Sequence, residues 1–182
     1  MSENEEVAPV LVLTGPPGAG KTTLASRLAE TSGRPAAHLH SDDFFDYIKS
    51  GFIAPWLRES AHQNRTISRA LAAAACAYAR GGYWVVLDGV VGPWHLDMYR
   101  DESRRTGVPL DYVVLRPDRE TAVRRARDRE ITPLPTYPPN IYDGFSDLGP
   151  FEGHAIDTTN LEVEAAVGHV RAGLAAGRFR LD

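Results

Sequence analysis

A glycine-rich segment followed by lysine and threonine carries the strongest chemical signal in the sequence. Residues 15–22 read Gly-Pro-Pro-Gly-Ala-Gly-Lys-Thr and match G-x-x-x-x-G-K-[ST] at every fixed position. Glycines let a backbone turn so tightly that successive N–H groups converge on phosphate oxygens. The lysine then suits the β- and γ-phosphates, and the hydroxyl suits Mg²⁺. The pattern predicts a nucleotide site formed by Gly15, Pro16, Pro17, Gly18, Ala19, Gly20, Lys21, Thr22 and Thr23.

Carboxylates at two further places in the sequence are candidates for catalysis and for metal binding. Asp42 and Asp43 follow one short apolar run, and Asp88 ends another, Trp-Val-Val-Leu-Asp. A carboxylate near a transferred phosphoryl group can accept the proton of an attacking hydroxyl or orient that hydroxyl. We assign this role to Asp42, and we assign Mg²⁺ binding to Thr22 and Asp88. The alternatives are a helix N-cap, which suits Asp43 best, and an Asp-Gly turn at Asp88.

Five arginines lie within residues 119–129. At helical spacing Arg124 shares a stripe with acidic residues, whereas Arg125 and Arg129 border the apolar side of the same helix. A guanidinium on such a border can pack its stem while its planar fork reaches an anionic oxygen. The pair resembles the Arg-x-x-x-Arg lid helix of small P-loop kinases, and this resemblance implies that Arg125 and Arg129 contact the nucleotide phosphates and assist catalysis. The alternative is a solvated, charged helix face.

Polar and aromatic residues after the acidic segment are candidates to recognise a phosphate acceptor. They are Trp56, Arg58, His62, Asn64 and Arg65. A histidine or asparagine near a helix start is also common as a cap or as a surface group. Tyr137 and Phe145 flank a segment with four prolines at 131–142, which excludes a helix interior there. Both aromatics are candidates to cover the site or to pack beside it.

These residues need a scaffold, and the chain alternates short apolar runs with helical patterns. We expect strands at 10–14, 36–40, 84–88, 111–116 and 154–157. We expect helices at 21–30, 60–80, 94–106, 119–129 and 161–176. In helix 60–80 the inward stripe should contain Ile67, Ala70, Leu71, Ala74 and Tyr78. This alternation predicts an α/β fold with a parallel sheet, in which ligands bind beyond the carboxyl ends of the strands.

Composition limits the remaining classes of function. The chain has 182 residues, 43% of them hydrophobic, and a net charge of −4. We expect one domain, 1–182, with residues 1–8 as a flexible tail. The acidic balance disfavours duplex nucleic acid and anionic membranes as partners, and one cysteine excludes a disulfide framework. The N-terminus is polar and acidic, unlike a signal peptide, so we expect a soluble, cytoplasmic protein.

The segment Ser41-Asp42-Asp43-Phe44-Phe45 resembles the corresponding segments of nicotinamide riboside and uridine kinases and of chloramphenicol phosphotransferase. With the glycine-rich loop, Asp88 and the arginine helix, the chain is most similar to chloramphenicol phosphotransferase-like and gluconate-kinase-like proteins. The resemblance implies a three-layer α/β P-loop NTPase fold with about five parallel strands in the order 2-3-1-4-5. It also implies that Asp42 lies between the acceptor hydroxyl and the γ-phosphate.

We therefore predict a kinase that transfers the γ-phosphoryl group of ATP or GTP to an alcohol group of a small molecule, with Mg²⁺. An antibiotic, a sugar or a nucleoside-like metabolite would be the acceptor. The sequence contains no Asn-Lys-x-Asp guanine signature, which weakens a GTPase interpretation. Two alternatives remain open: a toxin-like or polynucleotide-end kinase, and a regulatory module that binds nucleotide without catalysis.

Overall fold

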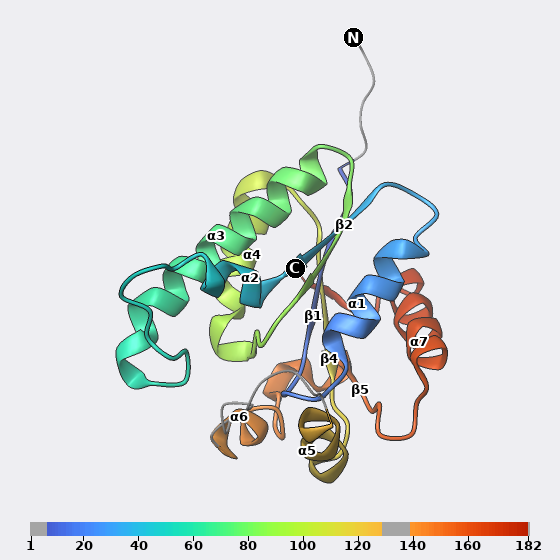
Figure 1. Cartoon of the computed structure of the whole chain (residues 1–182). Coiled ribbons are helices and arrows are strands. Elements are labelled where there is room, and N and C mark those ends of the chain that lie inside the picture. Colours follow the sequence, from blue (N-terminus) through green and yellow to red (C-terminus); the bar gives the residue numbers. More distant parts are fainter. Residues whose placement is uncertain (1–6, 129–138, 182) are drawn as a thin grey trace.

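The computed structural model describes residues 7–128 and 139–181, and its strands form one sheet (Figure 1). The strands are β1 (Val10–Thr14), β2 (Ala36–His40), β3 (Trp84–Asp88), β4 (Leu110–Leu115), β5 (Ala155–Ile156) and β6 (Arg180–Leu181). The first five lie side by side in the order β2-β3-β1-β4-β5, and every neighbouring pair among them is parallel. This order confirms the predicted P-loop fold.

Helices cover both faces of the sheet. They are α1 (Lys21–Glu30), α2 (Ser41–Asp46), α3 (Ala61–Arg80), α4 (Leu96–Thr106), α5 (Arg119–Arg127), α6 (Pro139–Asp143) and α7 (Val163–Ala175). Short 3-10 turns span Arg58–Ser60, Pro93–His95 and Gly149–His154. Figure 1 shows α3 and α4 on one face, α1 and α7 on the other, and α5 beyond the ends of the strands. Among the described residues, no helix is long and apolar enough to cross a membrane.

The central strands β1, β3 and β4 are buried along their whole length. Because successive side chains of a strand point to opposite faces, each of these strands contributes to two cores. Val10 and Val12 pack with Leu71 on the α3 side, whereas Leu11 packs with Leu28 on the α1 side. Strands that are buried on both faces need apolar residues at successive positions, which explains the runs of Val and Leu without alternation. The strands end at a common edge of the sheet.

Helix α3 is rotated relative to the predicted stripe. Ile67 and Leu71 are buried as expected, but Ala70 and Tyr78 are exposed, Tyr78 to 47%. The helix packs against α4 as well as the sheet, so its buried face also takes in Ala72, Ala75, Cys76 and Ala79. An alanine-rich helix offers several equivalent faces to a local pattern, and the position of α4 decides which of them is buried.

The chain departs from the expected elements in four other places. Helix α6 forms within the proline-rich segment 131–142, where we expected no helix interior, because Pro139 is its first residue and proline is tolerated in the first turn. Helix α2 begins at Ser41, directly after β2, so Asp43 is its third residue and not the predicted N-cap of a later turn. The strand β6 was not predicted; it pairs antiparallel with β4, and two residues carry no periodic pattern. Ala8, which we assigned to a tail, is 5% exposed, and its N–H donates to the carbonyl of Ala79 at 3.3 Å.

Candidate functional site

The glycine-rich loop connects β1 to α1 and has the backbone shape that its sequence predicts. Gly15 has φ 148° and Gly20 has φ 88°, backbone angles that residues with a Cβ rarely adopt. A Cβ at Gly15 would also collide with the carbonyl oxygen of Leu115 at the end of β4. The loop is thus folded against the sheet edge, and Gly20 leads directly into the N-terminus of α1, where unpaired N–H groups favour an anion.

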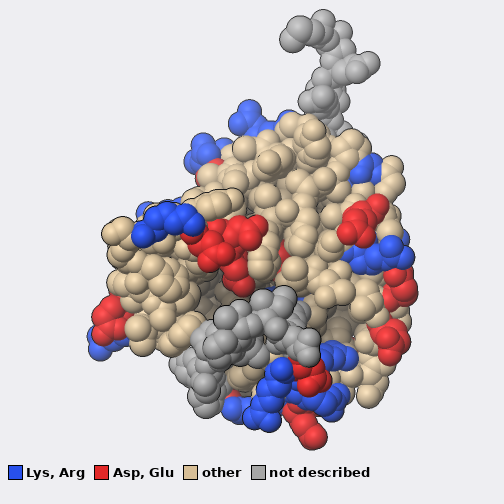
Figure 2. Space-filling view, in the orientation of Figure 1, with Lys and Arg blue, Asp and Glu red and all other residues tan. Residues whose placement is uncertain are grey.

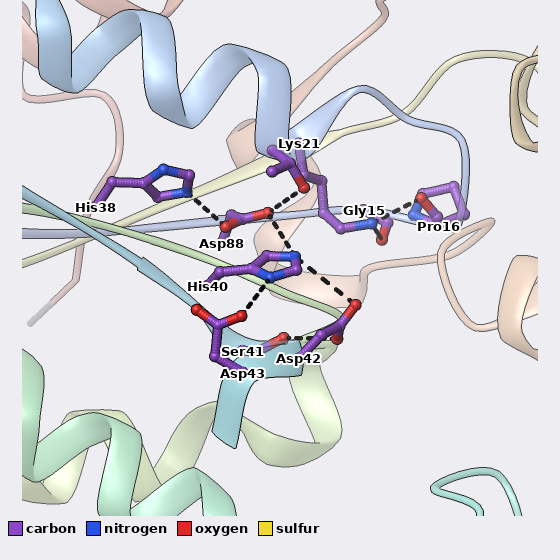
Figure 3. Close-up of polar contacts among 10 residues, drawn as sticks. Gly15, Pro16, Lys21, His38, His40, Ser41, Asp42, Asp43 and Asp88 are labelled. Atoms are coloured by element: carbon purple, nitrogen blue, oxygen red, sulfur yellow. Dashed lines mark hydrogen bonds and ion pairs between the residues drawn. The ribbon is translucent and has the colours of Figure 1, made fainter. Parts of the chain in front are cut away.

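The side chain of Lys21 folds back over this loop. Its Nζ donates to the carbonyls of Gly15 and Pro16, each at 3.0 Å (Figure 3). The ammonium group therefore lies at the mouth of the loop, beside the first turn of α1. A positive charge at this position matches the β- and γ-phosphate role that the sequence assigns to Lys21.

Asp88 lies beside the loop and is completely buried. Its Oδ2 accepts a hydrogen bond from the Thr22 hydroxyl at 2.8 Å, and its Oδ1 lies 2.7 Å from His38 Nε2. A carboxylate only accepts hydrogen bonds, so His38 Nε2 carries a proton in this contact. Burial raises the pKa of Asp88, but the hydrogen bonds from His38 and Thr22 and the nearby imidazoles outweigh it, and the pKa is lowered overall.

Thr22 and Asp88 fit the predicted magnesium site. A hydroxyl and a buried carboxylate, 2.8 Å apart, are hard oxygen donors of the kind that Mg²⁺ takes beside nucleotide phosphates. The residues reach each other because Asp88 pairs with Leu13 in the β1–β3 register, one residue before the end of β1.

His40 lies between three carboxylates (Figure 3). Its Nε2 is 3.9 Å from Asp88 Oδ2 and 3.7 Å from Asp42 Oδ2, and its Nδ1 is 3.4 Å from Asp43 Oδ1. The imidazole thus connects the buried end of β3 to the acidic start of α2. We did not single out His38 or His40 from the sequence. Their i, i+2 spacing in β2 places both on one face, which was an available signal.

Asp42 and Asp43 diverge although they are adjacent. Asp42 lines the same cavity as Lys21 and Asp88, whereas Asp43 does not. Both side chains are well exposed, at 70% and 60%, and the hydroxyl of Ser41 donates to Asp42 Oδ1 at 3.3 Å. The geometry gives Asp42 access to a reacting group beside the loop. Its role as a base or an orienting group stays a prediction.

A cavity of about 940 Å³ begins at the loop and extends across the sheet edge. Its phosphate end includes the predicted residues Pro17, Gly18, Gly20, Lys21, Thr22 and Thr23. Gly15, Pro16 and Ala19 do not line it; they shape the loop. The other end is formed by Phe52, Trp56, Asn64, Leu71, Trp94 and Tyr99. One continuous space therefore joins the phosphate loop to an aromatic chamber.

Only part of the predicted acceptor group reaches this chamber. Trp56 and Asn64 line it, whereas Arg58, His62 and Arg65 do not. Phe145 is 1% exposed and packs against Trp94 with ring centroids 5.6 Å apart, so it supports the wall from the core and does not cover the site. Tyr137 lies outside the described residues.

The sequence interpretation missed Trp94 as a wall of the site. It follows β3 in the turn Pro93–His95, at the sheet edge where ligands bind. The loop before it is fixed from both sides, since Val91 N donates to Thr14 Oγ1 at 2.8 Å and the Tyr112 hydroxyl donates to Val91 O at 2.9 Å. Its position after a strand that ends in Asp was the available signal.

Arg125 points to the turn that follows β5. Its guanidinium donates to the carbonyls of Thr158 and Thr159, each at 3.2 Å. Arg124, for which we predicted surface pairing with acids, donates to Thr121 Oγ1 at 3.4 Å. Arg129 lies outside the described residues. Phosphate contact by Arg125 and Arg129 stays a prediction, and Arg125 must leave these carbonyls to make it.

Comparison with known proteins identifies the group to which the fold belongs. Residues 10–135 match the family model described as AAA domain; this is more than half of the chain, so the chain belongs to that family. Its fold is that of small-molecule P-loop kinases. No functionally curated protein sequence is significantly similar to the chain.

Three solved structures illustrate the likeness in fold. A sugar kinase from Janibacter sp. HTCC2649 has a TM-score of 0.71 and 19% identity, over 92% of this chain and 95% of that chain. A tunicamycin resistance protein from Deinococcus radiodurans has a TM-score of 0.65 and 18% identity, over 92% and 95%. A gluconokinase from Sinorhizobium meliloti 1021 has a TM-score of 0.63 and 19% identity, over 93% of each chain.

Proposed function

We propose that the protein transfers the γ-phosphoryl group of ATP or GTP to an alcohol group of a small molecule. The observation that carries this proposal is the single cavity in which Lys21 and Thr22 lie at one end, Asp42 lies beside them, and an aromatic chamber follows. A phosphate loop alone would suit a regulator that only binds nucleotide. A carboxylate and a second chamber at the same opening suit an enzyme with a second substrate.

In the proposed reaction the acceptor oxygen forms a bond to the γ-phosphorus. The bond between that phosphorus and the oxygen bridging the β- and γ-phosphates breaks, and the nucleoside diphosphate leaves with the electron pair. The hydroxyl proton passes to the Asp42 carboxylate and then to solvent. Lys21 holds positive charge beside the oxygens that are transferred. Such catalysis consists mainly of positioning and charge neutralisation.

Thr22 and Asp88 would hold Mg²⁺ that enters with the nucleotide, with His38 keeping the Asp88 carboxylate oriented. The ion would neutralise charge on the phosphate oxygens. Asp88 is fully buried and its two oxygens already contact Thr22 and His38, whereas Asp42 is well exposed at the cavity. These contacts support Asp42, and not Asp88, as the carboxylate that faces the acceptor.

A labelling experiment tests the proposal. The protein is incubated with γ-labelled ATP or GTP, Mg²⁺, and separate pools of sugars, nucleosides, antibiotics and short oligonucleotides. We expect label on a small molecule. Label on an oligonucleotide end would favour a polynucleotide kinase, which the net charge of −4 disfavours. Nucleotide binding with no labelled acceptor in any pool would favour a regulator.

A further inference from the structure

The chamber beyond the phosphate loop is an apolar, aromatic space. Phe52 and Trp94 are each 52% exposed and Trp56 is 36% exposed, although all three line the cavity. Behind them Leu71 and Tyr99 close the floor with 1% and 2% exposure. Large apolar side chains that stay exposed around a cavity mark a ligand surface, because a bound apolar group would remove them from water.

Hydrogen bonds to α3 hold the chamber wall in place. Gln63 of α3 makes two hydrogen bonds to the backbone of Ile53: Ile53 N donates to Gln63 Oε1 at 2.8 Å, and Gln63 Nε2 donates to Ile53 O at 2.6 Å. Ser60 Oγ donates to Pro55 O at 2.9 Å. The segment that carries Phe52 and Trp56 is thus tied to α3, so the chamber is a preformed feature of the fold.

Asn64 adds one directed polar group to this wall. Its Nδ2 donates to Pro55 O at 2.7 Å and to Ser60 Oγ at 2.9 Å. The Pro55 carbonyl can only accept a hydrogen bond, so the amide must present its nitrogen there, and this fixes the orientation of Asn64. Its Oδ1 is buried and has no hydrogen-bond partner among the described residues. Asn64 therefore adds a third side-chain contact that holds this wall against α3.

The charges that line the chamber end of the cavity disfavour an anionic acceptor. Among the described residues that line it, Lys21 is the only lysine or arginine, and it belongs to the phosphate end. The acidic residues Asp42 and Asp46 line the mouth. Figure 2 shows this acidic group over α2, beside the hollow of the same face. An acceptor with a carboxylate or sulfate would meet no cation in the described chamber and would pass these carboxylates.

Two titratable side chains of the chamber, His95 and Tyr99, have pKa values shifted toward their uncharged forms. Burial lowers the pKa of His95, and the positive charge of Arg65 lowers it further. Burial raises the pKa of Tyr99 to about 12, although a hydrogen bond with Ser68 opposes this shift. Both residues line the cavity. They add hydrogen-bonding capacity to the aromatic walls without adding charge.

We propose that the acceptor is an alcohol carried on a ring-containing, largely apolar body that has no anionic group. Trp56 and Trp94 would contact the ring. This inference rests on the proposed kinase function, because it treats the chamber as the acceptor site. It disfavours acceptors of the sugar-acid type, which carry their own negative charge.

A binding experiment with stated probes tests the proposal apart from turnover. The full chain is loaded with Mg²⁺ and a non-hydrolysable ATP analogue, and binding is measured by calorimetry and by tryptophan fluorescence. The probes are 2-naphthaleneethanol, glucose, gluconate and shikimate. We expect the naphthyl alcohol to bind at least about tenfold more tightly than each of the others, since a buried aromatic ring removes a large apolar area from water. Equal or tighter binding of gluconate or shikimate, or no naphthyl binding, would overturn the proposal.

Two variants and a matched control locate the probe. Trp94→Ala should weaken naphthyl binding at least about tenfold, and Trp94→Phe should restore most of the loss. Tyr78→Ala removes an exposed aromatic that does not line the cavity, and it should leave binding unchanged. Should Trp94→Ala fold poorly, Trp56→Ala gives the same test from the opposite loop. Unchanged binding in folded variants of both tryptophans would place the probe elsewhere and overturn the assignment.

Label transfer then separates this inference from the proposed function. Transfer of label from ATP to aryl alcohols but not to gluconate or shikimate supports both. Transfer to gluconate or shikimate alone would sustain the kinase function and overturn the inference about the acceptor. Specific naphthyl binding with no transfer to any acceptor would overturn the kinase function, while the chamber would remain a site for apolar, ring-containing ligands.

Discussion

The hydroxyl of Thr22 donates a 2.8 Å hydrogen bond to Asp88 Oδ2, across 66 residues of sequence. The bond ties the first turn of α1 to the end of β3, next to the phosphate loop. His38 holds the other oxygen of the same carboxylate at 2.7 Å. Both oxygens of Asp88 are thus oriented by contacts with side chains of the protein. The site therefore needs little rearrangement to bind a nucleotide and its metal ion.

Replacement of Lys21 tests the phosphate loop. Lys21→Ala removes the ammonium group that donates to Gly15 and Pro16, and we expect phosphoryl transfer to be abolished while the fold is retained. Transfer of label and thermal unfolding are the two measurements. Lys49→Ala, an exposed lysine that does not line the cavity, is the matched control. Full activity and unchanged nucleotide affinity in Lys21→Ala would contradict the loop assignment.

Adjacent aspartates provide a paired test of the acceptor-facing carboxylate. Asp42→Asn keeps the size of the side chain but loses its charge, so we expect nucleotide binding to persist and single-turnover transfer to fall by at least about 10²-fold. Asp43→Asn should cost much less, because Asp43 does not line the cavity. An inactive Asp43→Asn beside an active Asp42→Asn would mean that the assignment is shifted by one residue. Two active variants would move the base elsewhere.

Arg125 and its neighbour separate a catalytic arginine from a charged helix face. If Arg125 leaves the carbonyls of Thr158 and Thr159 to reach the transferred phosphoryl group, Arg125→Ala should lower kcat more than it weakens acceptor binding. Arginines in this role contribute about 10³-fold or more in related phosphoryl transfers. Arg124→Ala on the same helix should have little effect. A kcat within a few-fold of the parent in both variants would leave Arg125 as a structural tie to the turn.

The protonation of Asp88 predicts a pH dependence of stability. Its pKa is below the ordinary 3.8 in the fold, since hydrogen bonds from His38 and Thr22 outweigh burial. A carboxyl group whose pKa is lowered by folding stabilises the fold at pH values above its pKa in the unfolded chain. This contribution is lost as the pH falls through the pKa of the folded state. Urea unfolding from about pH 5 to about pH 2 should therefore show the parent losing its advantage over Asp88→Asn. The variant Asp101→Asn, which changes an exposed residue, is the control and should show the same pH dependence as the parent. A difference in unfolding free energy between the parent and Asp88→Asn that stays constant down to the lowest pH would refute this role.

The two hydrogen bonds between Gln63 and Ile53 predict that the Ile53 amide is protected from hydrogen exchange. This protection can be measured without knowing the acceptor. Gln63→Leu removes the acceptor of the Ile53 N–H, and amide hydrogen exchange at Ile53 should accelerate at least about tenfold. His62→Ala, one residue away and exposed, should leave that exchange unchanged. Naphthyl binding should weaken in Gln63→Leu because Phe52 and Trp56 lose their support. Unaltered exchange in a folded Gln63→Leu would show that other contacts hold the segment.

Local signals in the sequence suffice to predict several parts of this protein. The phosphate loop is a contiguous motif, and its glycines specify their own backbone shape, so the residue types at 15–22 suffice to assign it. The predicted strands 10–14, 36–40 and 84–88 have the same ends in the fold. The first and third are buried along their whole length, and such parallel strands read as short apolar runs between turn residues. Thr22 and Asp88 follow from the same rule, because Asp88 ends a strand and Thr22 lies just beyond the loop that follows another.

Tertiary structure decided what depends on contacts between distant segments. The sequence favours Asp42 over Asp43 as the acceptor-facing carboxylate, but the turn of α2 after β2 is what puts Asp42 and not Asp43 in the cavity. The aromatic chamber joins Phe52, Trp94 and Tyr99 from three segments, and no local periodicity links them. The position of Arg125 on its helix predicts contact with a phosphate, but in the fold its guanidinium donates a hydrogen bond to the carbonyl of Thr158. Local patterns report which face a residue prefers, whereas the partner on that face is set by packing of the whole chain.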